Sequence, residues 1–188
     1  MMLYAPPIDP PRDPAEDFEA FTQLPENSGR DFELIAGRIV EKIVSRPRQS
    51  SVAARLLILM GSFVLQHKLG RVTGADGGYQ VGPERYIPDV AYISKARQPL
   101  QPDEAYNPLP PDLAVEVLSP SNTDDDMRIK IGNYIAAGTV VWVLDPDRQR
   151  VEVYRPGQAV TVLGITATLD GGALLPGFAV ALADLFAD

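Results

Sequence analysis

The chain has 188 residues, 45% of them hydrophobic and none of them cysteine. This length suffices for one domain with a proper core and is short for two large ones. Without cysteine the chain forms no disulfide, thiolate metal site or cysteine nucleophile, and a reducing cytoplasm is the compartment that fits. The single histidine, His67, argues against a zinc site and against a Ser-His-Asp triad.

The formal net charge is −8 at pH 7, which argues against strong nonspecific binding to nucleic acid. The charge is uneven, because residues 30–72 hold eight basic and three acidic side chains. This segment is either a solvated helix face and hairpin rim or a patch that binds a nucleic-acid backbone. No apolar run approaches the ~20 residues of a membrane span, and the N-terminus does not resemble a secretory signal, so we expect no membrane association.

The first third of the chain predicts an arm, a helix, a hairpin and a second helix. Residues 1–14 contain five prolines and predict a flexible arm, so that residues 15–188 would form a single domain. Residues 15–23 indicate a short helix. DFELIAGRIVEKIV alternates apolar and polar residues on both sides of Ala36-Gly37, which is typical of a β-hairpin. Apolar residues then recur at helical spacing from 49 to 68.

The rest of the chain alternates strands and helices. RVTGA, GGYQVG and RYIPDVAYIS are three strand candidates, and the proline-rich ARQPLQPDEAYNPLPP follows as a long loop. DLAVEVLS indicates a central strand, and SPSNTDDDMRIKIGNYIAAG indicates a capped helix. VVWVLD and QRVEVYRP together indicate a second hairpin, and the tail indicates short strands with a final turn. This order predicts an α/β or α+β domain with a central mixed sheet flanked by helices.

Two apolar strand segments each carry one carboxylate, Asp89 in YIPDVAYI and Glu116 in LAVEVLSP. Strand alternation turns Glu116 to the same face as Asp112 and Ala114. A carboxylate in such a place is costly unless it is paired or binds a cation. If the two strands are neighbours, Asp89 and Glu116 can share Mg²⁺ or Mn²⁺. The alternative is that Asp89 caps a turn and Glu116 pairs with a cation for packing.

The helix after the Glu116 strand supplies Asp126 and Lys130, which lie four residues apart on one face. They are either an ordinary ion pair, or Lys130 reaches back over the strand end, where it would orient an attacking water or bind a phosphate. The helix dipole alone accounts for Asp124 and Asp125. Glu33 in the first hairpin is interpreted first as a solvent-facing residue, with a functional role as the alternative.

An ordered set of segments resembles a large bacterial family usually labelled putative restriction endonuclease, in the PD-(D/E)xK nuclease superfamily. The resemblance covers about residues 15–186 and implies a restriction-endonuclease-like core. The segments are DFELIAGRIVE, GADGGYQVG, IPDVAYIS, LAVEVLSPS, DMRIKIGNYIAAG, VWVLDP, VEVYRP and LLPGF.

The resemblance assigns roles to individual residues. Asp89 matches the Asp of the PD motif, and Glu116 matches the (D/E) position. The lysine normally found two residues later is replaced by Leu118, and Lys130 on the next helix matches the family's lysine instead. Asp126 belongs to the same family motif, and Glu33 matches an acidic position that helps to hold the metal in many members. Many members also carry a histidine near the start of the long helix, where this chain has Gln49-Ser50-Ser51.

The function expected from the resemblance is a magnesium- or manganese-dependent endonuclease that hydrolyses DNA phosphodiester bonds. Asp89 and Glu116 would bind the metal, Lys130 and Glu33 would complete the catalytic set, and Asp126 would support it. A homodimer is expected, and the apolar hairpin at 140–155 is a candidate for its interface. Two alternatives stay open, a non-catalytic binding or assembly module with the same fold and a phosphoesterase acting on a smaller substrate.

Overall fold

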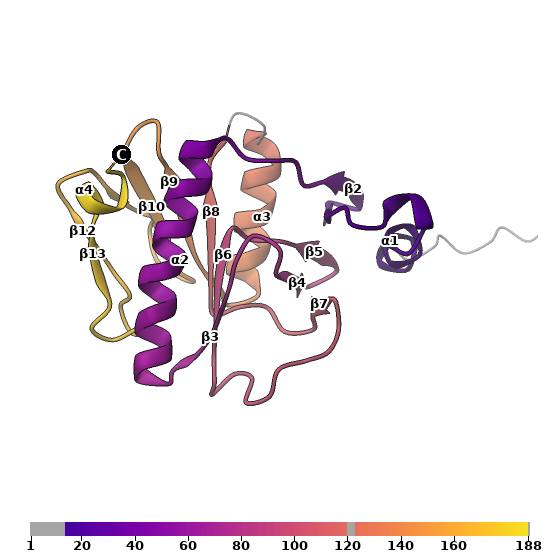
Figure 1. Cartoon of the computed structure of the whole chain (residues 1–188), viewed down its shortest axis with the longest axis horizontal. Coiled ribbons are helices and arrows are strands. Elements are labelled where there is room, and N and C mark those ends of the chain that lie inside the picture. The colour runs from indigo at the N-terminus through magenta and orange to yellow at the C-terminus, as the bar shows by residue number, and fades with distance from the viewer. Residues whose placement is uncertain (1–13, 120–122, 188) are drawn as a thin grey trace, which may run out of the picture.

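The computed structural model describes residues 14–119 and 123–187 (Figure 1). Apart from Pro14, which is the first residue of a helix, the predicted arm lies outside the described residues. The helices are α1 (Pro14–Thr22), the short 3-10 helix η1 (Pro25–Asn27), α2 (Pro47–His67), α3 (Asp124–Ala136) and α4 (Leu182–Leu185).

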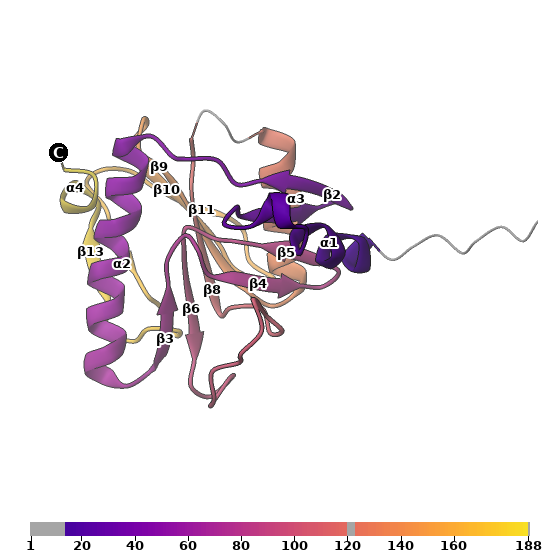
Figure 2. The same ribbon diagram turned by 45° about the vertical axis from the view of Figure 1, so that its right-hand side comes forward.

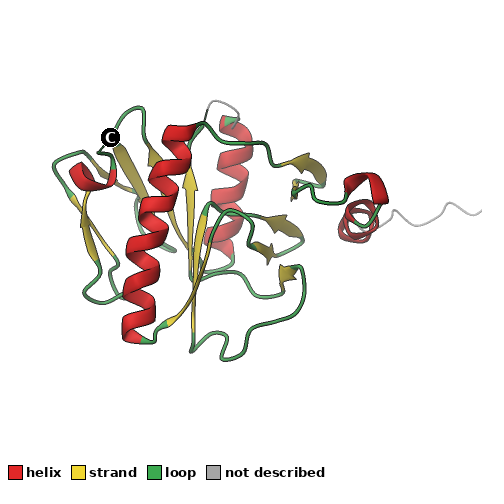
Figure 3. Cartoon of the chain, in the orientation of Figure 1, coloured by secondary structure: helices red, strands yellow, loops and turns green. Residues whose placement is uncertain are grey.

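The strands of the described residues form two larger sheets and one two-stranded ribbon (Figure 3). The six-stranded sheet has the order β11 (Thr161–Leu163), β10 (Arg150–Tyr154), β9 (Val140–Asp145), β8 (Leu113–Val117), β6 (Val90–Ser94), β3 (Gly70–Thr73). The five-stranded sheet has the order β2 (Arg38–Glu41), β1 (Phe32–Ile35), β5 (Glu84–Tyr86), β4 (Gly78–Val81), β7 (Tyr106–Asn107). The ribbon pairs β12 (Thr168–Asp170) with β13 (Ala179–Ala181).

The larger sheet is mixed and has a long helix on each face, as predicted. Strand β8 runs antiparallel to β6 and parallel to β9. Figure 1 shows α2 in front of this sheet and α3 behind it, and in the turned view of Figure 2 the two helices lie on opposite sides of its strands. The alternation of β8 explains the two layers, because Val115 packs in the same core cluster as Leu56 of α2, while Ala114 packs with Tyr134 of α3. Glu116 therefore faces α3.

The first hairpin forms around a tight two-residue turn at Ala36 and Gly37, which have φ angles of 51° and 70°. A turn of this kind matches the twist of the flanking strands. Phe32 and Leu34 pack against Phe18 of α1. Because side chains alternate along a strand, Glu33 and Ile35 point to the opposite face, toward α3.

Two connections differ from the sequence-based prediction. The segment RYIPDVAYIS forms two strands, because Ile87, Pro88 and Asp89 interrupt it, and it thereby passes from the smaller sheet to the larger one. Proline has no backbone N–H for a ladder hydrogen bond, which accounts for the break. The proline-rich loop also contributes a short strand, β7, which pairs parallel to β4.

The prediction of an interface on the hairpin at 140–155 is wrong. Strands β9 and β10 lie within the six-stranded sheet, covered on their outer edge by β11. Their large apolar side chains fill the core on both faces and are unavailable to a partner: Val141, Trp142, Val143, Leu144, Val151 and Val153.

Candidate active site

Asp89 and Glu116 lie beside each other at the end of two paired strands. The antiparallel register of β6 and β8 places Val90 opposite Val115, so one further step sets Asp89 opposite Glu116. Residues opposite each other in such a pair share a face of the sheet. The backbone N–H of Val117 donates to Asp89 Oδ2 at 2.7 Å, which fixes the Asp89 carboxylate against the end of β8.

Lys130 lies over the same strand end, as the second interpretation of its helix predicted. Its Nζ is 2.8 Å from Glu116 Oε1 and donates to Glu33 Oε1 at 2.9 Å. The residue is only 4% exposed. Asp126 and Lys130 do not form the ordinary ion pair, because the Asp126 carboxylate accepts a hydrogen bond from Arg38 of β2 instead.

Glu33 is buried rather than solvent-facing, so the first interpretation of this residue is wrong. Besides Lys130, its Oε1 accepts from the backbone N–H of Ile87 at 2.6 Å. The predicted alternation of the first hairpin is present, but the face that carries Glu33 is covered by α3 rather than by water. That covering is a tertiary contact, which local alternation does not specify.

Lys42 is a member of the site that the sequence-based prediction did not include. Its Nζ donates to Asp89 Oδ1 at 3.1 Å and to the backbone carbonyl of Ile87 at 2.6 Å. The signal was present in the hairpin, because Glu33 pairs with Val40 in register and Lys42 follows two residues later on the same face. One face of the hairpin thus directs Glu33 and Lys42 into the site and Arg38 to Asp126.

Aromatic residues enclose the Lys130 ammonium group. The ring of Tyr86 lies 5.4 Å from Nζ, a cation–π distance, and packs edge-on against Tyr134. The Tyr134 hydroxyl donates to Glu116 Oε1 at 3.1 Å, and Asn133 donates to the Tyr86 hydroxyl. Tyr134 stands one turn beyond Lys130 in the sequence, whereas Tyr86 carries no local signal of this role.

Burial and neighbouring charges act in opposite directions on the site's ionisation. Burial is the main reason why the pKa of Glu116 rises to about 7, and Lys130 only partly opposes that rise. Burial alone would lower the pKa of Lys130, but attraction to Glu116 and Glu33 outweighs it and raises the pKa. Burial also raises the pKa of Tyr86 to about 12, so its hydroxyl stays protonated at neutral pH. Lys130 is therefore a permanent cation here, and Glu116 is the group that titrates near neutrality.

The site opens into a cavity of about 270 Å³, lined by all five predicted residues together with Lys42. The three carboxylates of Glu33, Asp89 and Glu116 face two ammonium groups, which leaves a net charge of −1 when all are ionised. Such a site tolerates one added dication and then attracts an anion.

The site offers a divalent cation a small set of donors. Among the described residues, no group of three or more acidic or histidine side chains is placed to hold a metal ion. Mg²⁺ does not need one, because it is commonly held by one or two carboxylates, with waters and substrate phosphates filling its remaining positions. Asp89 and Glu116 meet that requirement, provided that the metal replaces Lys42 at Asp89 Oδ1.

Comparisons with known proteins indicate the family and the fold of the chain. A family model described as "Uma2: Putative restriction endonuclease" matches residues 18–183. A crystal structure from Anabaena variabilis, described as a putative nuclease, is 25% identical to the chain and has a TM-score of 0.79. The match covers 89% of this chain and 96% of that one. The curated proteins contain no match.

Replacing Lys130 by methionine is expected to lower the free energy of unfolding by about 3–5 kcal/mol, because it leaves two buried carboxylates without their cation. Urea unfolding followed by circular dichroism measures the change. The matched control is Arg128→Ala on the same helix, an exposed residue for which about 0.5 kcal/mol or less is expected. Equal stability of the two variants would show that Lys130 does not neutralise the site.

The raised pKa of Glu116 predicts a pH dependence of the metal-free protein. The folded state holds this proton more tightly than the unfolded chain, so the stabilisation is present at acidic pH and is lost as the pH rises through about 7. The Glu116→Gln variant has no proton to lose at this position, so its stability lacks this pH dependence. In EDTA, the melting temperature of wild type should therefore fall relative to Glu116→Gln between about pH 5 and pH 8. The control is Asp125→Asn, which keeps Glu116, so its melting temperature should change with pH in parallel with that of wild type. If Glu116→Gln also runs parallel to wild type, the assignment is contradicted.

Proposed function

The chain belongs to the Uma2 family of putative restriction endonucleases, and we propose that it is a magnesium- or manganese-dependent nuclease that hydrolyses DNA phosphodiester bonds. The observation that carries the proposal is the meeting of Asp89, Glu116 and Lys130 in one cavity. Asp89 and Glu116 would hold the metal, which when bound would neutralise charge on the phosphate and acidify a water.

The chain's own groups supply the rest of the chemistry. The Lys130 ammonium group lies at the cavity wall, where it stabilises negative charge that develops on a phosphate. Glu33 and the Tyr86 ring hold that ammonium group in place. Lys42, held by Ile87, can pass from the Asp89 carboxylate to a phosphate oxygen when a metal binds, because both positions adjoin the same cavity. Asp126, paired with Arg38, supports the hairpin against α3.

The mouth of the cavity has the character of a nucleic-acid contact. Ile43 lines the cavity, and the adjacent Val44 is 96% exposed. Arg46 forms no ion pair with a described residue, and Arg48 is 3.7 Å from Asp147 at its closest. An unpaired guanidinium group and one that is held only by an exposed ion pair, beside exposed apolar side chains, suit the phosphates and bases of DNA. This short stretch is the part of the basic segment 30–72 that we assign to DNA binding.

Two sites, one in each protomer, would allow both strands of a duplex to be cut in a single binding event. We therefore propose that the nuclease acts as a homodimer on duplex DNA.

A non-catalytic DNA-binding or assembly module with the same fold is the alternative. The observation that favours it is that Lys42 and Lys130 already neutralise Asp89 and Glu116 without a metal.

Plasmid cleavage in Mg²⁺ or Mn²⁺ is the experiment that separates these two functions. We expect wild type to nick or linearise the plasmid and Asp89→Asn to lose ~100-fold or more of the rate, since the variant removes a charged metal donor. Asp125→Asn, an exposed carboxylate on α3, is the matched control and should cut like wild type. Absence of cleavage by wild type across both metals, in a protein that binds DNA, would favour the non-catalytic module. Activity that survives Asp89→Asn would remove this residue from the site.

Arg46→Ala combined with Arg48→Ala should weaken binding to duplex DNA by about tenfold at ~50 mM salt. The logarithm of the binding constant falls linearly with the logarithm of the salt concentration, and this slope should become shallower by about one for each DNA phosphate that the variant no longer binds. Fluorescence anisotropy without divalent metal separates this binding from cleavage. Lys68→Ala, at the opposite end of α2, is the matched control and should bind like wild type. Equal losses in the two proteins would place the DNA elsewhere.

A further inference from the structure

Helix α2 has an outer face without charge. Between Arg48 and Lys68 the helix contains one charged residue, Arg55, and its guanidinium group is held by the backbone carbonyls of Asp184, Leu185 and Ala187. The inner face fills the core through Val52, Leu56, Met60 and Val64. The outer face nevertheless exposes Ile58 at 65% and Leu65 at 75%. Large apolar side chains that gather on an exposed face indicate an interaction surface.

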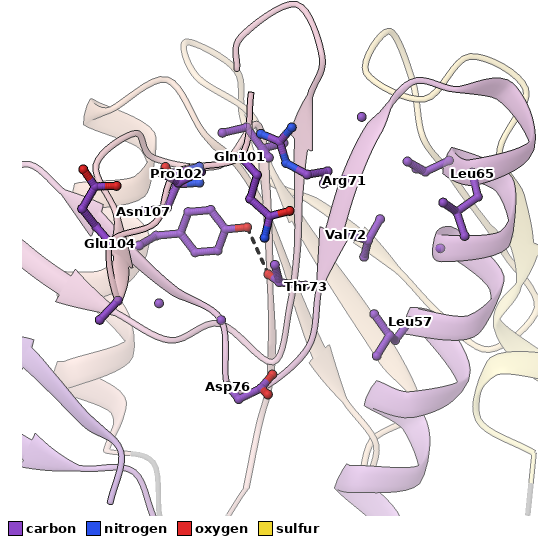
Figure 4. Close-up of a pocket in the computed structure, with 18 of the residues that line it drawn as sticks. Leu57, Leu65, Arg71, Val72, Thr73, Asp76, Gln101, Pro102, Glu104 and Asn107 are labelled. Atoms are coloured by element: carbon purple, nitrogen blue, oxygen red, sulfur yellow. Dashed lines mark hydrogen bonds between the residues drawn. The ribbon is translucent and has the colours of Figure 1, made fainter. Parts of the chain in front are cut away.

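This outer face borders an apolar cavity of about 620 Å³ that is separate from the candidate active site. Figure 4 shows Leu57 and Leu65 of α2 on one side of it, Glu104 and Asn107 on the other, and Val72 and Thr73 of β3 between them. Strand β3 is the edge of the six-stranded sheet. Protruding apolar side chains and a hollow that can receive them therefore lie side by side on one surface.

Small residues deepen the hollow at the helix. Gly61 and Ser62 lie between Ile58 and Leu65 and line the cavity. A Cβ atom added at Gly61 would meet no neighbour within 4 Å, so this glycine is not required by packing inside the chain. Glycine inside a helix is less favourable than alanine. Small residues on an outward helix face allow another helix to approach closely.

We propose that this surface, made of the outer face of α2 and the adjacent cavity, associates with the same surface of a second copy of the chain. In a two-fold symmetric dimer the same surface patch of each copy contacts its equivalent on the other copy. The patch must therefore carry both the projections and the hollows that receive them. Ile58 and Leu65 of one copy would enter the cavity beside Gly61 and Ser62 of its partner. The inference supplies the surface for the proposed homodimer, and it does not depend on nuclease activity.

The dimensions indicate which parts must take part. The part of α2 from Leu57 to His67 is about 16 Å long, and at about 10 Å of width it offers about 160 Å². A standard interface buries about 800 Å² per partner. The helix alone is too small, so β3 and the loop at 101–107 must contribute. Leu100, directly before that loop in the chain, is 82% exposed and adds a further apolar side chain next to it.

A second copy fits this surface better than a lipid bilayer does. Length and composition alone would let α2 cross a membrane, and it is the only helix of the described residues to which this applies. Its inner face is committed to the core, however, and the cavity beside its outer face carries the acidic Asp76 and Glu104. The hydrocarbon of a bilayer has no partner for these carboxylates, whereas Arg71 at the same cavity gives a second copy a cation that can pair with them.

The candidate active site stays open in such a dimer. The two cavities share no lining residue, and the catalytic one adjoins the segment before α2, whereas the proposed surface occupies the helix from Leu57 onward. Each protomer would therefore present its own cavity to DNA.

The first test is the mass of the full chain in solution. Sedimentation equilibrium should give twice 20.4 kDa for wild type and should show a dissociation constant raised roughly a hundredfold or more in the double variant Ile58→Lys and Leu65→Lys. Both residues are exposed in the protomer, so circular dichroism should report an unchanged fold. The matched control is Val162→Lys, 55% exposed on β11 at the other edge of the sheet, which should stay dimeric.

A second test uses the absence of cysteine in the chain. Ser62→Cys should give a covalent dimer with a short bis-maleimide linker, and Thr161→Cys on β11 should not. A monomeric wild type, a dimer indifferent to the lysines on α2, or cross-linking through Thr161→Cys alone would overturn the proposal. Co-flotation of wild type with anionic phospholipid vesicles, abolished in the α2 double variant, would assign the surface to a membrane and would also overturn it. Plasmid cleavage by a monomeric wild type would leave the proposed nuclease standing without this interface.

Discussion

The buried ammonium group of Lys130 is the interaction that unites the parts of this protein. It comes from α3, and it binds Glu116 from the six-stranded sheet and Glu33 from the five-stranded sheet. Each carboxylate alone would be costly at its depth, and so would the ammonium group. Together they are tolerated, and the requirement that they meet fixes how the hairpin, the central strands and the helix pack. Arg38 with Asp126 repeats the same connection at the rim of the site.

Much of this arrangement follows from local sequence. The alternation of DLAVEVLS turns Glu116 toward α3, and the 3.6-residue period of the next helix brings Lys130 back over the strand end. The mixed sheet with a helix on each face followed from the order of apolar segments, and the observed fold class confirms it. These features depend on periodicity and on neighbours in the chain, which a sequence displays directly.

What the sequence did not disclose depends on which face a distant element covers. Glu33 and Lys42 lie on a hairpin face that looks solvent-exposed until α3 is placed on it. The hairpin at 140–155 looks like an apolar surface until β11 and the helices surround it. The division of RYIPDVAYIS into strands of two sheets is a further case, because Pro88 marks the break but not where the two halves go. Each miss is a tertiary choice that local pattern leaves open.

The distances along the chain between the members of the Lys130 cluster bear on how the protein is made. Lys130 and Glu33 are 97 residues apart, and Asp89 is 28 residues from Val117, from whose backbone N–H it accepts a hydrogen bond. Contacts of such long range form late, after other packing has offset the entropy of loop closure. During synthesis, the chain has no assembled site until α3 has emerged and docked. A chain that ends before α3 therefore leaves the carboxylates of Glu33 and Glu116 without the cation that they share in the folded protein.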